Sequence, residues 1–174
     1  MIERLHPLAD RIAERLKARG EKVAVADGAT GGLMSAALLT VPGALAFYVG
    51  GGVVYSVRSR RVLFGLGPGA FRGQQSATES YALMQARGIR DNFGADWGVA
   101  ETGAVGGSTH PMGVASGTSV AAVVGPGIEL TRLTQTGSDV RIANMEAFAT
   151  AALRLLEAAL DQAGAGAPAT GADG

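Results

Sequence analysis

Apolar positions along the chain alternate between the spacing of helices and the short continuous runs of buried strands. Across residues 3–20 they recur every three or four positions, with charged residues between them, at Leu5, Leu8, Ile12 and Leu16. This spacing predicts a helix that Gly20 ends, and the apolar run 22–26 predicts a buried strand. Residues 27–32, Asp-Gly-Ala-Thr-Gly-Gly, then lead into a predicted helix over 32–39. A loop that follows a strand and opens a helix is where open α/β sheets bind ligands, so 27–32 is the first candidate site.

The rest of the chain continues this alternation of strands and helices. Strands are predicted at 49–57, 96–101, 112–124 and 129–136, and helices at 76–93 and 140–162. The turn signal Gly125-Pro126-Gly127 makes the last two strands a hairpin, which requires a mixed sheet. We therefore expect a single α/β domain, residues 1–163, built as a three-layer α/β/α sandwich. The Ala/Gly/Pro-rich tail 164–174 is expected to be mobile.

Composition and charge narrow the classes of function. The 15 basic and 15 acidic residues cancel, which argues against a nucleic-acid-binding or anionic membrane surface. The chain has no cysteine, and its two histidines, His6 and His110, lack zinc-type spacing, so we expect no metal and no cofactor. The first 20 residues are charged and amphipathic, unlike the apolar run of a signal peptide, and no run of ~18 apolar residues predicts a transmembrane helix. A cytoplasmic protein with no membrane partner is the simplest expectation.

Four stretches, in order and at fitting distances, resemble one family, the CinA C-terminal domain. They are 25–33 (VADGATGGL), 39–44 (LTVPGA), 51–56 (GGVVYS) and 94–103 (GADWGVAETG). The resemblance covers roughly residues 5–160, and active family members are nicotinamide-nucleotide amidohydrolases. It implies a reaction in which nicotinamide mononucleotide loses ammonia to give nicotinic acid mononucleotide, with a serine, a tyrosine and a lysine as the catalytic groups. The family often carries a further N-terminal domain, and we expect this chain to be a stand-alone, divergent version.

Departures from the family pattern fall on the catalytic positions. Gly28 stands where the family has its serine nucleophile, Asp27 replaces a glutamate, and Arg60 stands where the lysine belongs. Glycine cannot form an acyl-enzyme, and arginine is a poor general base. Tyr55 alone of the three catalytic groups is retained. The resemblance thus implies a protein that has kept the pocket, for a nucleotide-like or other small anionic ligand, but has lost the serine-amidase reaction.

The candidate site residues follow from this comparison. The expected ligand-binding residues are Gly28, Thr30, Gly31, Gly32, Gly51, Gly52, Thr102, Gly103 and Arg141. The catalytic candidates are Tyr55, Arg60 and Asp27, where Asp27 is either a carboxylate at a helix N-terminus or a base for water attack. Arg60 is an alternative ligand for phosphate or carboxylate. His110 is interpreted as a surface-loop residue rather than a catalytic base.

Three functions remain open at this point. The first is a nucleotide-like or other small-anion pocket without serine-amidase activity. The second is an active amidohydrolase that uses Thr30, Asp27 or an activated water. The third is a non-catalytic, partner-binding homo-oligomer; a homo-oligomer is expected in any case, with Met145 and Phe148 in the core or at a subunit contact.

Overall fold

A computed structural model describes residues 1–64, 67 and 69–165, whose strands form one sheet in the order β2-β1-β3-β4-β5. The strands are β1 (Val23–Asp27), β2 (Tyr48–Val53), β3 (Trp97–Ala104), β4 (Thr118–Gly125) and β5 (Ile128–Gln135). Strand β1 pairs in parallel with β2 and β3, whereas β4 pairs antiparallel with β3 and β5. The expected mixed sheet, with a hairpin at its end, is confirmed.

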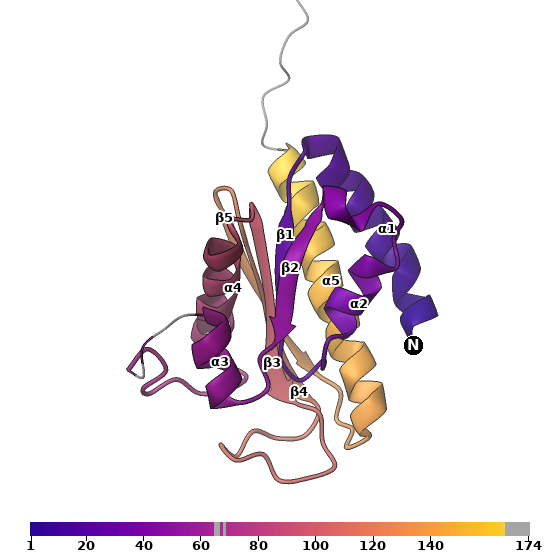
Figure 1. Cartoon of the computed structure of the whole chain (residues 1–174). Coiled ribbons are helices and arrows are strands. Elements are labelled where there is room, and N and C mark those ends of the chain that lie inside the picture. The colour runs from indigo at the N-terminus through magenta and orange to yellow at the C-terminus, as the bar shows by residue number, and fades with distance from the viewer. Residues whose placement is uncertain (65–66, 68, 166–174) are drawn as a thin grey trace, which may run out of the picture.

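Helices cover both faces of this sheet (Figure 1). On one face lie α1 (Ile2–Arg19), α2 (Leu33–Leu39) and α5 (Arg141–Ala165), and on the other lie α3 (Val57–Phe64) and α4 (Glu79–Phe93). A short 3-10 turn, η1 (Ala44–Ala46), precedes β2. The arrangement is the expected single-domain, three-layer α/β/α sandwich.

Strand β1 is buried on both faces, which explains its uninterrupted apolar sequence. Successive side chains of a strand point to opposite faces. Val23 and Val25 accordingly pack into the core beneath α1, α2 and α5, whereas Ala24 and Ala26 pack into the core beneath α3 and α4. The strand therefore holds the loop that follows it at a fixed place between the two helical layers.

The segment after β2 differs from the predicted strand 49–57. The strand ends at Val53, and α3 begins at Val57, so the basic residues 58–61 are helical. Two serines stop the strand and start the helix. The N–H of Ser59 donates to Ser56 Oγ (3.1 Å), and the N–H of Ser56 donates to Ser59 Oγ (2.9 Å), a reciprocal cap of the kind that opens helices. Tyr55 consequently lies in a turn rather than on a strand.

Three other helix or strand ends also differ from their predicted positions. Strand β4 begins at Thr118 rather than at 112, because Gly113 (φ 71°) and Gly117 (φ 75°) adopt left-handed conformations that a strand excludes. Strand β3 continues to Ala104, beyond the predicted end at 101. Helix α4 begins at Glu79 rather than at 76, since Ala77 has a positive φ of 57°.

The structure describes only part of the predicted C-terminal tail and does not test the expected subunit contact. Helix α5 runs to Ala165, so residues 164 and 165 of the predicted tail are helical, and the remainder, 166–174, lies outside the described residues. Phe148 is buried in the core, and the homo-oligomer stays a prediction. No helix in the described part of the chain combines the length and apolar character that crossing a membrane requires.

Candidate functional site

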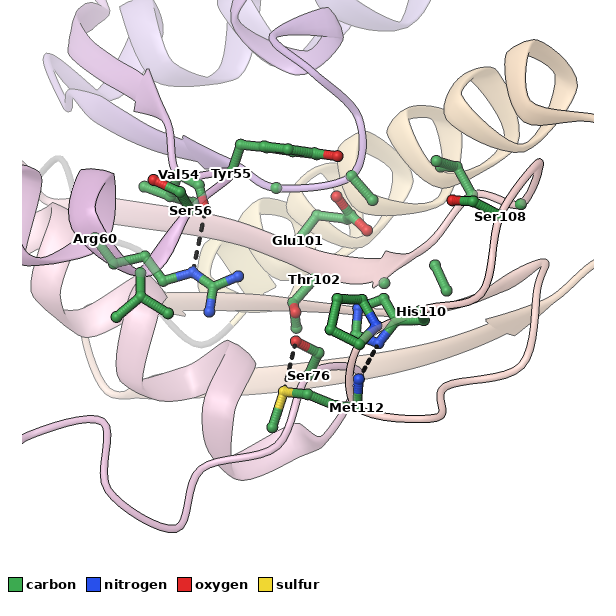
Figure 2. A pocket seen from close by; sticks show the side chains of 18 of the residues that line it. Val54, Tyr55, Ser56, Arg60, Ser76, Glu101, Thr102, Ser108, His110 and Met112 are labelled. Atoms are coloured by element: carbon green, nitrogen blue, oxygen red, sulfur yellow. Dashed lines mark hydrogen bonds between the residues drawn. The ribbon is translucent and has the colours of Figure 1, made fainter.

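A pocket of about 340 Å³ lies beyond the carboxyl ends of β1 and β3 (Figure 2). The chain leaves β1 toward β2 on one side, and β3 pairs with β1 on the other side. Open α/β sheets bind ligands at such a switch point. The walls come from the segments after β1 and β2, from the last residues of β3 and those that follow it, from loop 108–112, and from Ser76, Gln85 and Arg141. The volume falls in the range of small-molecule sites, about 300–1,000 Å³.

Asp27 does not line this pocket; its fully buried carboxylate lies at the start of α2. Oδ1 accepts the hydroxyl of Thr30 (2.8 Å) and the N–H of Met34 (3.0 Å). Oδ2 accepts the hydroxyl (2.6 Å) and the N–H (3.2 Å) of Ser35. These bonds satisfy helix N–H groups that have no partner within the helix. The geometry matches the interpretation of Asp27 as a helix-terminal carboxylate and does not bring it to a ligand.

Replacing Asp27 tests this structural role. Asp27→Asn turns one acceptor oxygen into a donor that faces the N–H groups of α2, so we expect a loss of about 1–3 kcal/mol in unfolding free energy. Urea unfolding of the wild type, Asp27→Asn and the exposed control Asp91→Asn measures the loss. Unchanged stability of Asp27→Asn together with altered ligand binding would contradict the assignment.

Several other residues of the glycine loops also lie outside the pocket. Thr30 is fully buried: its hydroxyl donates to Asp27, and its N–H donates to Glu101 Oε2 (3.0 Å). The remaining four are glycines. At three of them the missing side chain leaves room for a neighbouring group: the Met145 side chain at Gly31, the Val25 carbonyl oxygen at Gly51 and the Leu63 side chain at Gly52. The fourth, Gly32, precedes α2 with a positive φ of 99°. The structure thus gives these glycines packing or backbone roles.

Gly28 lines the pocket, and the backbone of β3 closes over it. A Cβ at this position would overlap the carbonyl oxygen of Glu101 and would lie 3.3 Å from Glu101 Oε2. The carbonyl belongs to β3, which pairs with β4 at Glu101 itself and with β1 up to the neighbouring Ala100, so the backbone is held in place there. The loop after β1 therefore excludes any side chain at the position where the family resemblance implies a serine.

Glu101 is the buried carboxyl group of the pocket, and the sequence reading did not single it out. Its Oε1 accepts the hydroxyl of Ser119, and its Oε2 accepts the N–H of Thr30. Burial raises the pKa of Glu101 from 4.5 to about 7, the bonds from Ser119 and Thr30 oppose the shift, and the charge of Asp27 adds to it. The group therefore exchanges a proton near neutral pH, as residues of functional sites often do.

Arg60 reaches the pocket from the first half of α3. Its Nε donates to the Val54 carbonyl (3.1 Å; Figure 2), and its guanidinium carbon lies 5.2 Å from the centre of the Tyr81 ring. These two contacts hold a permanent positive charge at the pocket wall. His110 also lines the pocket, and burial, followed by the charge of Arg60, lowers its pKa. His110 is thus a neutral pocket residue at pH 7 rather than only a surface-loop residue.

The remaining residues of the predicted site line the pocket in different ways. Tyr55 is 69% exposed and stands at the rim. Thr102 and Gly103 line the wall near the carboxyl end of β3. Arg141, at the start of α5, also lines the pocket and donates through Nη1 to the Gly106 carbonyl (3.1 Å).

The charges at the pocket favour an anion. Against the two arginines, Arg60 and Arg141, the described lining residues include one carboxyl group, Glu101, whose pKa burial raises to about 7. His110 contributes no charge there. Positive charge around a concave site attracts and orients phosphate or carboxylate groups.

Glu101 and Gln85 are two buried polar residues of the pocket that the sequence did not single out. A carboxylate inside the apolar strand sequence WGVAET was an available signal, because an unpaired buried glutamate is rare. Gln85 offered a weaker signal, since it is a polar residue on the apolar face of α4. Neither residue is near the 27–32 loop in sequence.

Comparison with known proteins places the whole domain in one group. The model of the CinA C-terminal domain matches residues 5–160. A CinA-like protein from Anaeromyxobacter dehalogenans is 35% identical over 154 residues, 88% of this chain and 37% of that protein. A CinA-like protein from Mycolicibacterium vanbaalenii is 35% identical over 160 residues, 89% of this chain and 36% of that protein. The chain thus spans little more than a third of the length of these curated relatives.

Solved structures agree with this placement. A CinA superfamily protein from Klebsiella pneumoniae superposes with a TM-score of 0.82 at 26% identity, covering 91% of this chain and 98% of that one. The competence/damage inducible protein CihA from Agrobacterium tumefaciens has a TM-score of 0.82 at 27% identity, covering 91% and 96%. The shared fold therefore extends over nearly the full length of both solved chains.

Proposed function

Because the chain belongs to the CinA C-terminal domain family and its pocket has two arginines but no serine after β1, we propose that it binds a small anionic ligand without serine-amidase catalysis. The ligand class is the one the family resemblance implies, nicotinamide mononucleotide or a similar pyridine nucleotide. Its phosphate provides the anion for the arginines.

The observation that carries the proposal is the closed environment of Gly28. A serine amidase needs a hydroxyl that faces the substrate carbonyl, with a base beside it. Here the Glu101 carbonyl occupies the place of any side chain at residue 28. Thr30, the nearest hydroxyl along the loop, is buried against Asp27. Loss of the nucleophile with retention of a polar pocket supports binding rather than acyl transfer.

Two measurements test the proposal together. Nicotinamide mononucleotide is expected to raise the melting temperature, because a ligand that binds only the folded state stabilises it. Ammonia release from the same nucleotide is expected to stay at the level of a protein-free blank. Turnover through a covalent acyl intermediate, trapped and located by mass spectrometry, would contradict the proposal, and so would the absence of any thermal shift.

Arg60 provides the variant for the binding measurement. We expect Arg60→Ala to weaken binding of the nucleotide about tenfold to a hundredfold, because it removes a charged hydrogen-bond donor from the pocket wall. Isothermal titration calorimetry measures the dissociation constants. Arg58→Ala, on the exposed side of the same helix and outside the pocket, is the control and should bind as the wild type does. Equal losses in both variants would mean that the effect is nonspecific electrostatics.

Glu101 favours a second candidate, a hydrolase that activates water. Its carboxylate lies beside the position of the missing nucleophile, and its pKa of about 7 suits a general base. Water would add to the carboxamide carbon, give its proton to Glu101, and the C–N bond would break as Glu101 returns that proton to the departing ammonia. Ammonia release that rises with pH through about 7 and disappears in Glu101→Gln would favour this candidate.

A further inference from the structure

Gln85 presents an unusual polar group at the pocket. It lies in α4, is 1% exposed and lines the cavity, yet its amide nitrogen Nε2 has no hydrogen-bond partner among the described residues. Buried amide groups are nearly always paired, because desolvation without a partner is costly. A buried donor that borders a cavity is therefore in a position to bind a ligand acceptor.

The surroundings of Gln85 on α4 make its polarity more notable. The other buried positions of the same helix include Ala82, Ala86 and Ile89, which pack into the apolar core. Tyr81 lies one helical turn before Gln85, on the same side, and its buried hydroxyl likewise has no partner among the described residues. An apolar side chain at 85 would suit this core, so packing alone does not account for the amide.

Other groups that line the pocket also donate hydrogen bonds. The Arg60 guanidinium stacks over the Tyr81 ring and has no acceptor capacity. The hydroxyl of Thr102 accepts the N–H of Ala77 (3.4 Å), which leaves its own proton available. The sole carboxyl group of the described lining, Glu101, is engaged by Ser119 and Thr30. This wall therefore complements a group that only accepts hydrogen bonds and carries negative charge.

We propose that Gln85 and Arg60 form an oxyanion subsite, which binds a carboxylate or phosphate group of the ligand. The inference rests on the proposed function and extends it, because it assigns the anionic group to the α4 side of the pocket. The amide of Gln85 donates to one oxygen, and the guanidinium of Arg60 neutralises the charge. The neutral carboxamide of nicotinamide, which presents its own N–H donors, fits this wall less well.

The substitution Gln85→Leu distinguishes a ligand-binding role of the amide from a structural one, because it should raise the stability of the free protein and lower its affinity for the ligand. Without ligand, removal of an unpaired buried amide should raise the melting temperature by about 2–4 °C. With ligand, loss of a donor to a charged oxygen should weaken binding about tenfold. Gln85→Met, which keeps the unbranched chain, is the second variant in case leucine packs poorly. Gln162→Leu, the same change at an exposed position of α5, should alter neither quantity.

Pairs of probes identify the oxyanion. Nicotinate is compared with nicotinamide, and nicotinamide mononucleotide with the riboside that lacks its phosphate, each by calorimetry on wild type and Gln85→Leu. A defect confined to nicotinate indicates a carboxylate subsite, and one confined to the mononucleotide indicates a phosphate subsite. If the wild type binds none of the pyridine compounds, inorganic phosphate is the remaining probe. That result would reject the pyridine nucleotide of the proposed function, but it would leave the oxyanion subsite to be tested with phosphate.

Three outcomes would overturn the subsite. The first is a fall in melting temperature for both Gln85 variants, which would mean that the amide is a structural hydrogen-bonding group. The second is unchanged affinity of the variants for every oxyanion that the wild type binds. The third is a wild type that binds neither the pyridine compounds nor inorganic phosphate, even if Gln85→Leu is more stable.

Discussion

Gly28→Ser is expected to destabilise the protein by about 3 kcal/mol and to give no amidase activity, because the added Cβ overlaps the Glu101 carbonyl oxygen. The overlap involves backbone of a central strand, which cannot relax as a flexible side chain can. Gly28→Ala should lower the stability by about the same amount, since the overlap is caused by the Cβ and not by the hydroxyl. Adding Arg60→Lys to Gly28→Ser restores the family's residues in sequence and is still expected to fail.

Urea unfolding of the two Gly28 variants gives the stability loss, and ammonia release from nicotinamide mononucleotide gives the activity. Gly69→Ser is a matched control, because a Cβ there meets nothing within 4 Å among the described residues. A Gly28→Ser protein that is as stable as the wild type would refute the proposed steric exclusion. If the double variant also released ammonia, the serine-amidase machinery would be intact apart from two side chains.

Glu101→Gln is expected to remove a pH dependence from the stability of the protein. Burial raises the pKa of Glu101 from 4.5 to about 7, so the folded protein keeps a proton that the unfolded chain has released. Stability from this group is therefore greatest below pH 4.5, falls as the pH rises to about 7, and is constant above. The whole change is on the order of 3 kcal/mol. At pH 8 the glutamine variant should exceed the wild type by this amount, and at pH 4.5 the two should be equal.

Chemical unfolding at several pH values measures this difference, and subtracting the two profiles cancels the contribution of other titrating groups. Glutamine can keep both hydrogen bonds of the carboxyl group, since its oxygen accepts from Thr30 and its nitrogen donates to Ser119. Infrared spectroscopy of the carboxyl stretch follows the proton directly. Parallel stability profiles for the wild type and the variant would show that Glu101 ionises as an ordinary carboxylate. Buried groups that lower the stability of a protein when charged at neutral pH are typical of functional sites.

The limits of the sequence are clearest in the 27–32 loop. The sequence predicts the strand before the loop and the helix after it, because strand burial and helical spacing are local patterns. It does not predict the direction in which each loop residue points. Asp27 and Thr30 turn toward α2, whereas Gly28 faces the pocket, and this division depends on how α2 packs against β1 and β2.

Residue identity alone determined the α/β class, the alternation of strands and helices, the family and the absence of a serine at position 28. Only the tertiary structure decided that Glu101 and Gln85 share a pocket with Arg60, since they come from β3, α4 and α3. It also decided why position 28 is a glycine, because the obstructing carbonyl lies on another strand. Local patterns follow from the periodicity of single elements, whereas a site arises from the register and packing between elements that are distant in sequence.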